Sequence, residues 1–109
     1  MANYVFIESR DPFESRDTQF VVETASDLKE RGNDVTVFLV QNGVLAARQN
    51  ARGSHLPRLA EAGVRLLADD FSLRERGIQA TELSSGIQES NIDALVDLLI
   101  QENTKAIWH

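Results

Sequence analysis

Residues 35–40 (VTVFLV) constrain the fold more than any other stretch of the chain. The segment is rich in β-branched and aromatic residues, which favours a strand. Both of its alternating sets of side chains are largely apolar, so both faces of the strand must be covered by other parts of the protein. Strands of this kind are typical of parallel sheets that carry helices on each side. We therefore predict a buried strand over residues 34–40 within such a sheet.

Strand-like and helix-like segments alternate along the rest of the chain. The predicted strands cover residues 3–7, 34–40, 64–68, 79–83 and 104–108, and helices are expected over residues 17–31, 44–48, 56–62, 71–76 and 90–103. This alternation indicates right-handed crossovers between mainly parallel strands. The sequence therefore predicts an α/β fold, a three-layer sandwich with a mainly parallel five-stranded sheet and helices on both faces, in one domain of residues 1–109.

The prediction includes three finer details: two helix caps, one apolar helix position and the identity of the central strand. Asp17 and Ser90 are residue types that cap helix N-termini, so we expect them to cap the first and last helices. Phe20 falls on the predicted apolar side of the first helix together with Val21 and Ala25. The strand over residues 64–68 is expected to be the central one.

Composition excludes several classes of function. The chain has no cysteine, which excludes disulfides, thiolate metal sites and sulfur-carrying nucleophiles. It has only two histidines, so we expect no metal site, and no glycine-rich phosphate motif, so we expect no cofactor. A net charge of −6 argues against nucleic-acid binding. No long apolar segment or secretory leader is evident, so we expect no membrane association and a cytoplasmic location.

Polar residues follow the predicted strands at the points where they end. Because the carboxyl ends of parallel strands meet at one edge, we expect four loops to form a candidate ligand site there. The candidate ligand-binding residues are Arg10, Asn42, Asp69, Asp70, Ser84 and Ser85. The two aspartates could also simply cap a helix. The polar segment 49–55, flanked by Arg48 and containing Arg52, fits a lid, a docking loop or plain disorder.

The order of several short motifs resembles the DsrE/DsrF-like family of small sulfur-relay proteins. They are the strand DVTVFLV followed by Asn42-Gly43-Val44, the Ala62-Gly63-Val64 turn, and Ser72-Leu73 followed by Arg76-Gly77-Ile78. The resemblance implies a fold of the type predicted above, and it places the sulfur-carrying cysteine of active family members at Asp69. A carboxylate at that position cannot carry sulfur.

The resemblance leaves two hypotheses. The first is a non-catalytic binding or assembly subunit, because the family implies self-association as homotrimers or homohexamers, or association with related subunits. The second is a small-ligand or nucleotide-type binding protein, or an enzyme, that uses the Asp69/Asp70 crevice with Arg10 and the Ser84-Ser85-Gly86 turn.

Overall fold

A computed structural model describes residues 2–51 and 54–109, so Arg52 lies outside the described residues. The elements in chain order are β1 (Asn3–Glu8), α1 (Thr18–Glu30), β2 (Asp34–Leu39), the 3₁₀ helix η1 (Gln41–Ala47), α2 (Leu56–Glu61), β3 (Arg65–Asp69), α3 (Asp70–Glu75), the 3₁₀ turn η2 (Ala80–Glu82), β4 (Ile87–Ser90), α4 (Ile92–Leu99) and β5 (Thr104–Trp108). The five strands form one sheet in the order β4-β3-β2-β1-β5, and every neighbouring pair is parallel. The predicted α/β architecture is confirmed.

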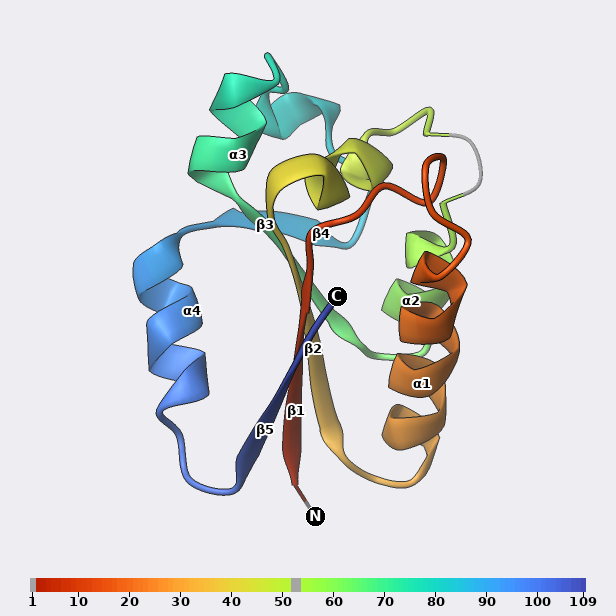
Figure 1. Cartoon of the computed structure of the whole chain (residues 1–109), viewed down its shortest axis with the longest axis vertical. Helices are drawn as coiled ribbons and strands as arrows, with labels where there is room; N and C mark the ends of the chain where they lie inside the picture. The colour runs from red at the N-terminus through yellow and green to blue at the C-terminus, as the bar shows by residue number, and fades with distance from the viewer. Residues whose placement is uncertain (1, 52–53) are drawn as a thin grey trace.

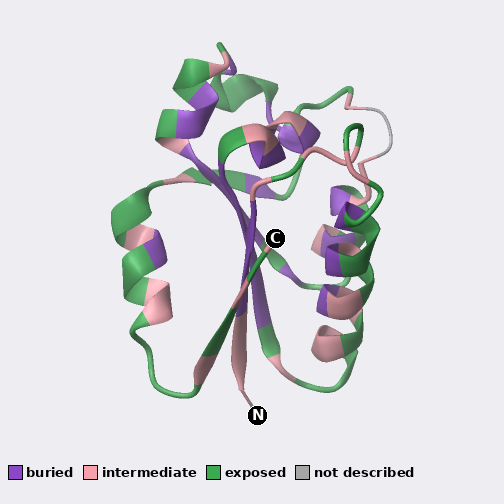
Figure 2. Cartoon of the chain, viewed as in Figure 1, coloured by how far each residue is buried: buried purple, intermediate pink, exposed green. Residues whose placement is uncertain are grey.

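Helices cover both faces of the sheet, but unequally (Figure 1). Helices α1 and α2 lie on one face. Among the described residues, α4 is the only helix on the other face, where it packs through Leu95 on β1, β2 and β3. Buried residues are concentrated in the sheet and on the inner sides of α1 and α2, whereas α4 is mostly exposed or half-buried (Figure 2). Within the described residues, no helix is long and apolar enough to cross a bilayer.

The predicted strand over residues 79–83 is wrong. Residues 80–82 form the 3₁₀ turn η2, and the fourth strand begins only at Ile87. Leu83 makes an isolated antiparallel bridge to Arg48, and its buried side chain belongs to the hydrophobic core, so its apolar character reflects core packing from a loop. The true strand reads Ile-Gln-Glu-Ser and lies at the sheet edge, where polar residues are tolerated and the apolar signal is weak.

Several local predictions are also corrected. Ser90 ends β4, and it is Asn91 that caps α4 by accepting a hydrogen bond from the Ala94 backbone at 2.9 Å. Asp17 makes no side-chain cap bond, and Phe20 is exposed. The middle strand of the sheet is β2, with β3 between β2 and β4. Residues 41–47 form a 3₁₀ helix in place of the short helix predicted over residues 44–48.

Candidate functional site

Asp69 lies at the junction of β3 and α3, and the residue is buried with 7% of its surface exposed. Its Oδ2 atom accepts two hydrogen bonds from Ser72, one from the backbone N–H at 2.9 Å and one from the hydroxyl at 2.7 Å. The first is the N-cap bond that a short helix needs, because the N–H groups of its first turn have no partner within the helix. The capping interpretation of Asp69 is therefore confirmed.

The same hydroxyl group joins α3 to the loop after β2. The backbone N–H of Gln41 donates to Ser72 Oγ at 2.8 Å. Gln41 has a φ of 50°, which is unusual for a residue other than glycine. Arg76 adds a second link, because its Nε and Nη2 atoms donate to Asn42 Oδ1 at 3.1 and 3.0 Å. Its Nη1 atom donates to the Ser72 carbonyl at 3.2 Å. We call Asp69, Ser72, Asn42 and Arg76, with the Gln41 backbone, the closed network.

Of the six residues predicted as ligand-binding, the structure brings only Asp69 and Asn42 into this network. Asp70 is the first residue of α3 and pairs with Arg74 one turn later at 3.6 Å. Arg10 lies in the loop after β1 and borders a small, mainly apolar cavity beneath that loop. The predicted crevice is therefore not a cluster of these side chains.

The predicted site requires Ser84 and Ser85 to lie directly after a strand, and in the structure they do not. They precede β4, because that strand begins at Ile87. Ser84 is held against the segment after η1, where its hydroxyl donates to the Arg48 carbonyl at 3.1 Å and its backbone N–H donates to the Ala47 carbonyl at 2.8 Å. Its polar groups therefore fasten one loop to another.

Glu8 is a buried carboxylate that the sequence analysis did not single out. It lies at the end of β1, and both of its oxygens lie near His109 Nδ1, at 3.0 and 2.8 Å. Burial raises the pKa of the Glu8 carboxyl above its usual value, while hydrogen bonds from His109 and from the backbone of Arg10 and Ser9 act in the opposite direction. The sequence could have indicated this burial, because residues two apart in a strand face the same side of a sheet. Glu8 therefore faces the α1 side together with the core residue Phe6.

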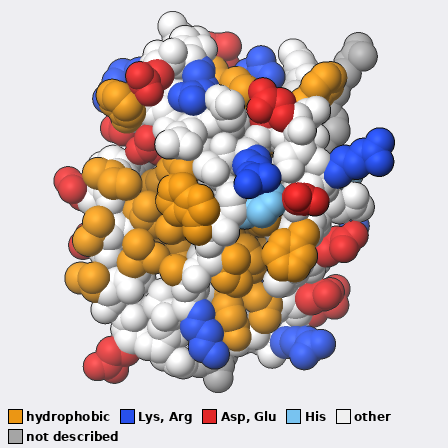
Figure 3. Space-filling model, viewed as in Figure 1, with side chains coloured by type: hydrophobic (Ala, Val, Ile, Leu, Met, Phe, Trp, Pro, Cys, Tyr) orange, Lys and Arg blue, Asp and Glu red, His pale blue; other side chains and the backbone are white. Residues whose placement is uncertain are grey.

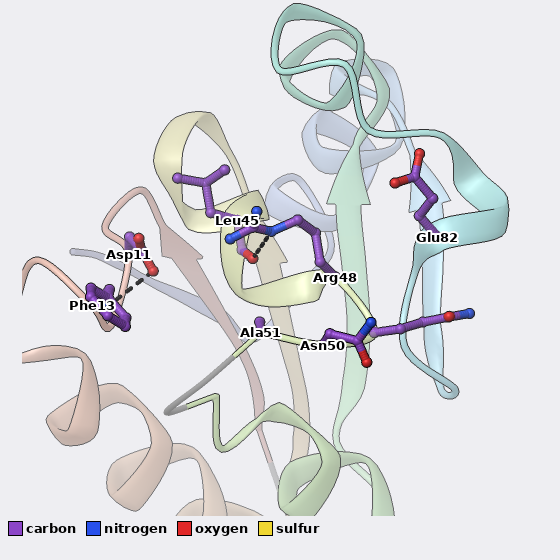
Figure 4. Close-up of a pocket in the computed structure, with 8 residues that line it drawn as sticks. Asp11, Phe13, Leu45, Arg48, Asn50, Ala51 and Glu82 are labelled. Carbon is purple, nitrogen blue, oxygen red and sulfur yellow. Dashed lines mark hydrogen bonds between the residues drawn. The ribbon is translucent and has the colours of Figure 1, made fainter.

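A second region at this edge of the sheet is an open cleft of about 490 Å³ (Figure 4). It lies between the loop after β1, the end of η1 and the η2 turn. The residues that line it are Asp11, Phe13, Leu45, Arg48, Gln49, Asn50, Ala51 and Glu82. Asp69 is not among them, so the closed network and the cleft are separate regions. Within the described residues, no three His, Asp or Glu side chains gather in an arrangement that could hold a metal ion.

The model of the DsrE/DsrF-like family matches residues 2–105. The chain belongs to this family. Two solved structures share the DsrE-like fold over 100% of both chains: the ychN protein from E. coli, with a TM-score of 0.88 and 18% identity, and MTH1491 from Methanobacterium thermoautotrophicum, a protein of unknown function, with a TM-score of 0.83 and 21% identity. No protein of curated function matches the sequence significantly.

Membership of the DsrE/DsrF-like family gives the absence of cysteine its meaning. Sulfur relay in the active members, as the resemblance implies, requires a thiol at the end of β3, and the chain has none at any position. The residue at that junction, Asp69, is a carboxylate whose Oδ2 atom already accepts two hydrogen bonds. This position can stabilise the start of α3, but it cannot form a persulfide.

Proposed function

We propose that this DsrE/DsrF-like chain is a non-catalytic binding or assembly subunit that associates with copies of itself. The observation that carries the proposal is the closed network at the family's reactive position. Asp69 is buried, and its hydrogen bonds are to Ser72 of the helix that it caps. Its role there is structural, which leaves the surface of the molecule as the place for function.

The surface that best supports assembly is the outer side of α4 with the adjoining strand β5. Ile92, Val96 and Ile100 follow one another at four-residue spacing, so they form one stripe along the helix, and all three are exposed. Trp108 of β5 is exposed too, and its register partner Ile7 belongs to the core cluster beneath α4. Because register partners in a parallel sheet face the same side, Trp108 lies on the same side of the sheet as α4.

This surface, which we call the α4 face, extends from the outer side of α4 to the neighbouring edge strand β5. Hydrophobic side chains gather over the region of α4 and β5 in the space-filling view (Figure 3). Contiguous exposed apolar patches of this kind mark interaction sites more often than isolated apolar residues do. Strand β5 is also an edge of the sheet, next to β1, and an open edge favours association with another chain.

A matched pair of substitutions tests this proposal. Ile92 and Phe20 are 57% and 56% exposed. Both lie in the first turn of a helix, where aspartate is well tolerated. We expect native mass spectrometry to find a homotrimer or homohexamer for the unmodified chain. Ile92→Asp should shift the population toward monomer, whereas Phe20→Asp should leave the oligomer unchanged.

Two results would contradict the assembly proposal. One is a monomer at micromolar concentration for the unmodified chain, and the other is an oligomer that Ile92→Asp and Phe20→Asp affect equally. Asp69→Asn supplies a further check, because it keeps the shape of the side chain and because Asp69 is buried, so it is not part of the exposed α4 face. We expect it to lower stability and leave the oligomeric state unchanged.

A further inference from the structure

The open cleft beside Arg48 has the size and the mixed chemistry of a small-molecule site. Its volume is about 490 Å³. Ligand pockets usually span roughly 300–1,000 Å³, so the cleft falls within their range. It combines an aromatic ring, an aliphatic side chain, one guanidinium group and two carboxylates, from Phe13, Leu45, Arg48, Asp11 and Glu82. None of these residues belongs to α4 or β5, so the cleft is independent of the proposed assembly surface.

Arg48 is oriented by the backbone. Its Nε atom donates to the Leu45 carbonyl at 2.9 Å, as the dashed line in Figure 4 shows. Within the described part of the chain, its two Nη atoms have no hydrogen-bond or ion-pair partner. A guanidinium group held at Nε presents its Nη atoms as donors, and paired N–H groups of this kind suit a carboxylate.

The walls of the cleft are fixed by hydrogen bonds on both sides of Arg48. On one side, the Gln49 backbone N–H donates to the Glu82 carbonyl at 2.9 Å, and its side-chain amide donates to the Thr81 carbonyl at 3.2 Å. On the other side, Asp11 Oδ1 accepts from the Phe13 backbone at 3.2 Å and so orders the turn that carries the ring. Ordered walls reduce the entropy that a ligand must overcome on binding.

The charges of the cleft narrow the class of ligand. Arg48 favours a carboxylate or a phosphate, but the carboxylates of Asp11 and Glu82 on either side of it disfavour a multiply charged anion. They favour instead a ligand that carries a positive group beside its negative one. Phe13 lies beside Asp11 and across the cleft from Leu45 (Figure 4). The residue is 78% exposed, so it offers an apolar surface next to the charged groups.

We propose that the cleft binds a zwitterionic amino acid with an apolar side chain. The α-carboxylate binds the Nη atoms of Arg48, and the ammonium group faces Asp11. The apolar side chain of the ligand packs on Phe13 and Leu45. This inference goes beyond the proposed assembly role, and its test depends on binding alone.

The experiment is a titration with L-phenylalanine followed by amide chemical shifts. 3-Phenylpropionate lacks the ammonium group and phenethylamine lacks the carboxylate, so the two probes test each charge separately on the unmodified protein. We expect L-phenylalanine to shift the amide signals of Leu45 and Arg48 with a Kd of about 1 mM, and both analogues to bind at least about tenfold more weakly.

Variants then assign the two charges to residues. Arg48→Gln should abolish the shifts, and Asp11→Asn should remove the preference for L-phenylalanine over 3-phenylpropionate. Arg74→Gln is the matched control, because Arg74 is an exposed arginine paired with Asp70 and does not line the cleft. It should leave the titration unchanged.

The proposal is overturned if L-phenylalanine causes no shift up to about 10 mM, a concentration that would reveal even weak binding. It is equally overturned if 3-phenylpropionate binds as well as L-phenylalanine, or if Arg48→Gln and Arg74→Gln titrate alike. The analogue series uses the unmodified protein, so it stays decisive even if a variant fails to fold.

Discussion

At the carboxyl edge of the sheet, the charged side chains of the closed network join two separate elements, whereas those of the cleft bond to backbone groups a few residues away. In the cleft, Arg48 donates to the Leu45 carbonyl, Asp11 accepts from the Phe13 N–H, and Glu82 accepts from the Gln79 N–H. Asp69 and Arg76 both meet partners in the chain, and their hydrogen bonds join α3 to the loop after β2. Within the described residues, the guanidinium group of Arg48 bonds to the protein through Nε, and its two Nη atoms have no partner. The difference shows that carboxylates at the end of a parallel strand, such as Asp69 and Asp70, do not by themselves make a ligand site. A side chain whose hydrogen-bonding atoms are already bonded within the protein is not available to a ligand.

The largest effect on stability is expected from Asp69→Ala. The substitution removes the cap of α3 and leaves the buried Ser72 hydroxyl without its acceptor, so we expect a loss of about 2–4 kcal/mol in the free energy of unfolding. Asp70→Ala is the matched control, because that carboxylate makes a solvent-accessible pair worth at most about 1 kcal/mol. Chemical denaturation of both variants measures the difference. Equal losses would show that the hydrogen bonds of Asp69 add no more to stability than the solvent-accessible Asp70–Arg74 pair does.

The fold could be predicted from the sequence where packing is regular, and less well where loops meet. The run of residues 35–40 predicted a strand covered on both faces, and β2 is the middle of the sheet. Residues 79–83 misled because Leu83 belongs to the hydrophobic core although it lies in a loop, where it bridges to Arg48, a residue distant in sequence. An edge strand such as β4 buries one residue, so its pattern carried little signal.

The candidate site was harder to predict than the fold. Asp69 was identified because it ends a strand and begins a helix, and both signals are local. Its link to Asn42 depends on Arg76, which the motif comparison noted without assigning a role to the side chain. The cleft combines residues from three separate segments, and the orientation of Arg48 depends on a backbone carbonyl. No local pattern encodes that combination.

A pair of arginine substitutions sharpens the comparison between the two regions. Arg76→Gln removes hydrogen bonds that join α3 to the loop after β2, so we expect a loss of about 1–2 kcal/mol in the free energy of unfolding. Arg48→Gln loses one exposed bond to a carbonyl, so its effect should stay within about 0.5 kcal/mol. Urea denaturation of the two variants under one set of conditions measures both. A larger loss for Arg48→Gln would mean that this side chain supports the fold.

The smallest effect on stability is expected from Glu8. It tests whether burial is what makes this carboxylate differ from the more exposed carboxylates of the cleft. Because burial raises its pKa in the folded state, the folded protein binds the Glu8 proton more tightly than the unfolded chain does. The resulting stabilisation is fully present below the ordinary pKa of 4.5 and is lost as the pH rises through the higher folded pKa. The unmodified protein should therefore gain stability relative to Glu8→Gln as the pH falls from neutral toward 4.5.

Thermal unfolding of the unmodified protein and of Glu8→Gln across that window measures the Glu8 contribution. His109→Ala should enlarge the pH dependence, because it removes the partner whose hydrogen bond lowers the pKa of Glu8. An opposite slope, with the unmodified protein losing stability relative to Glu8→Gln on acidification, would mean that His109 outweighs burial. Glu8 would then resemble Asp69, a carboxylate defined by its hydrogen bonds, and burial would not be what distinguishes it from the carboxylates of the cleft.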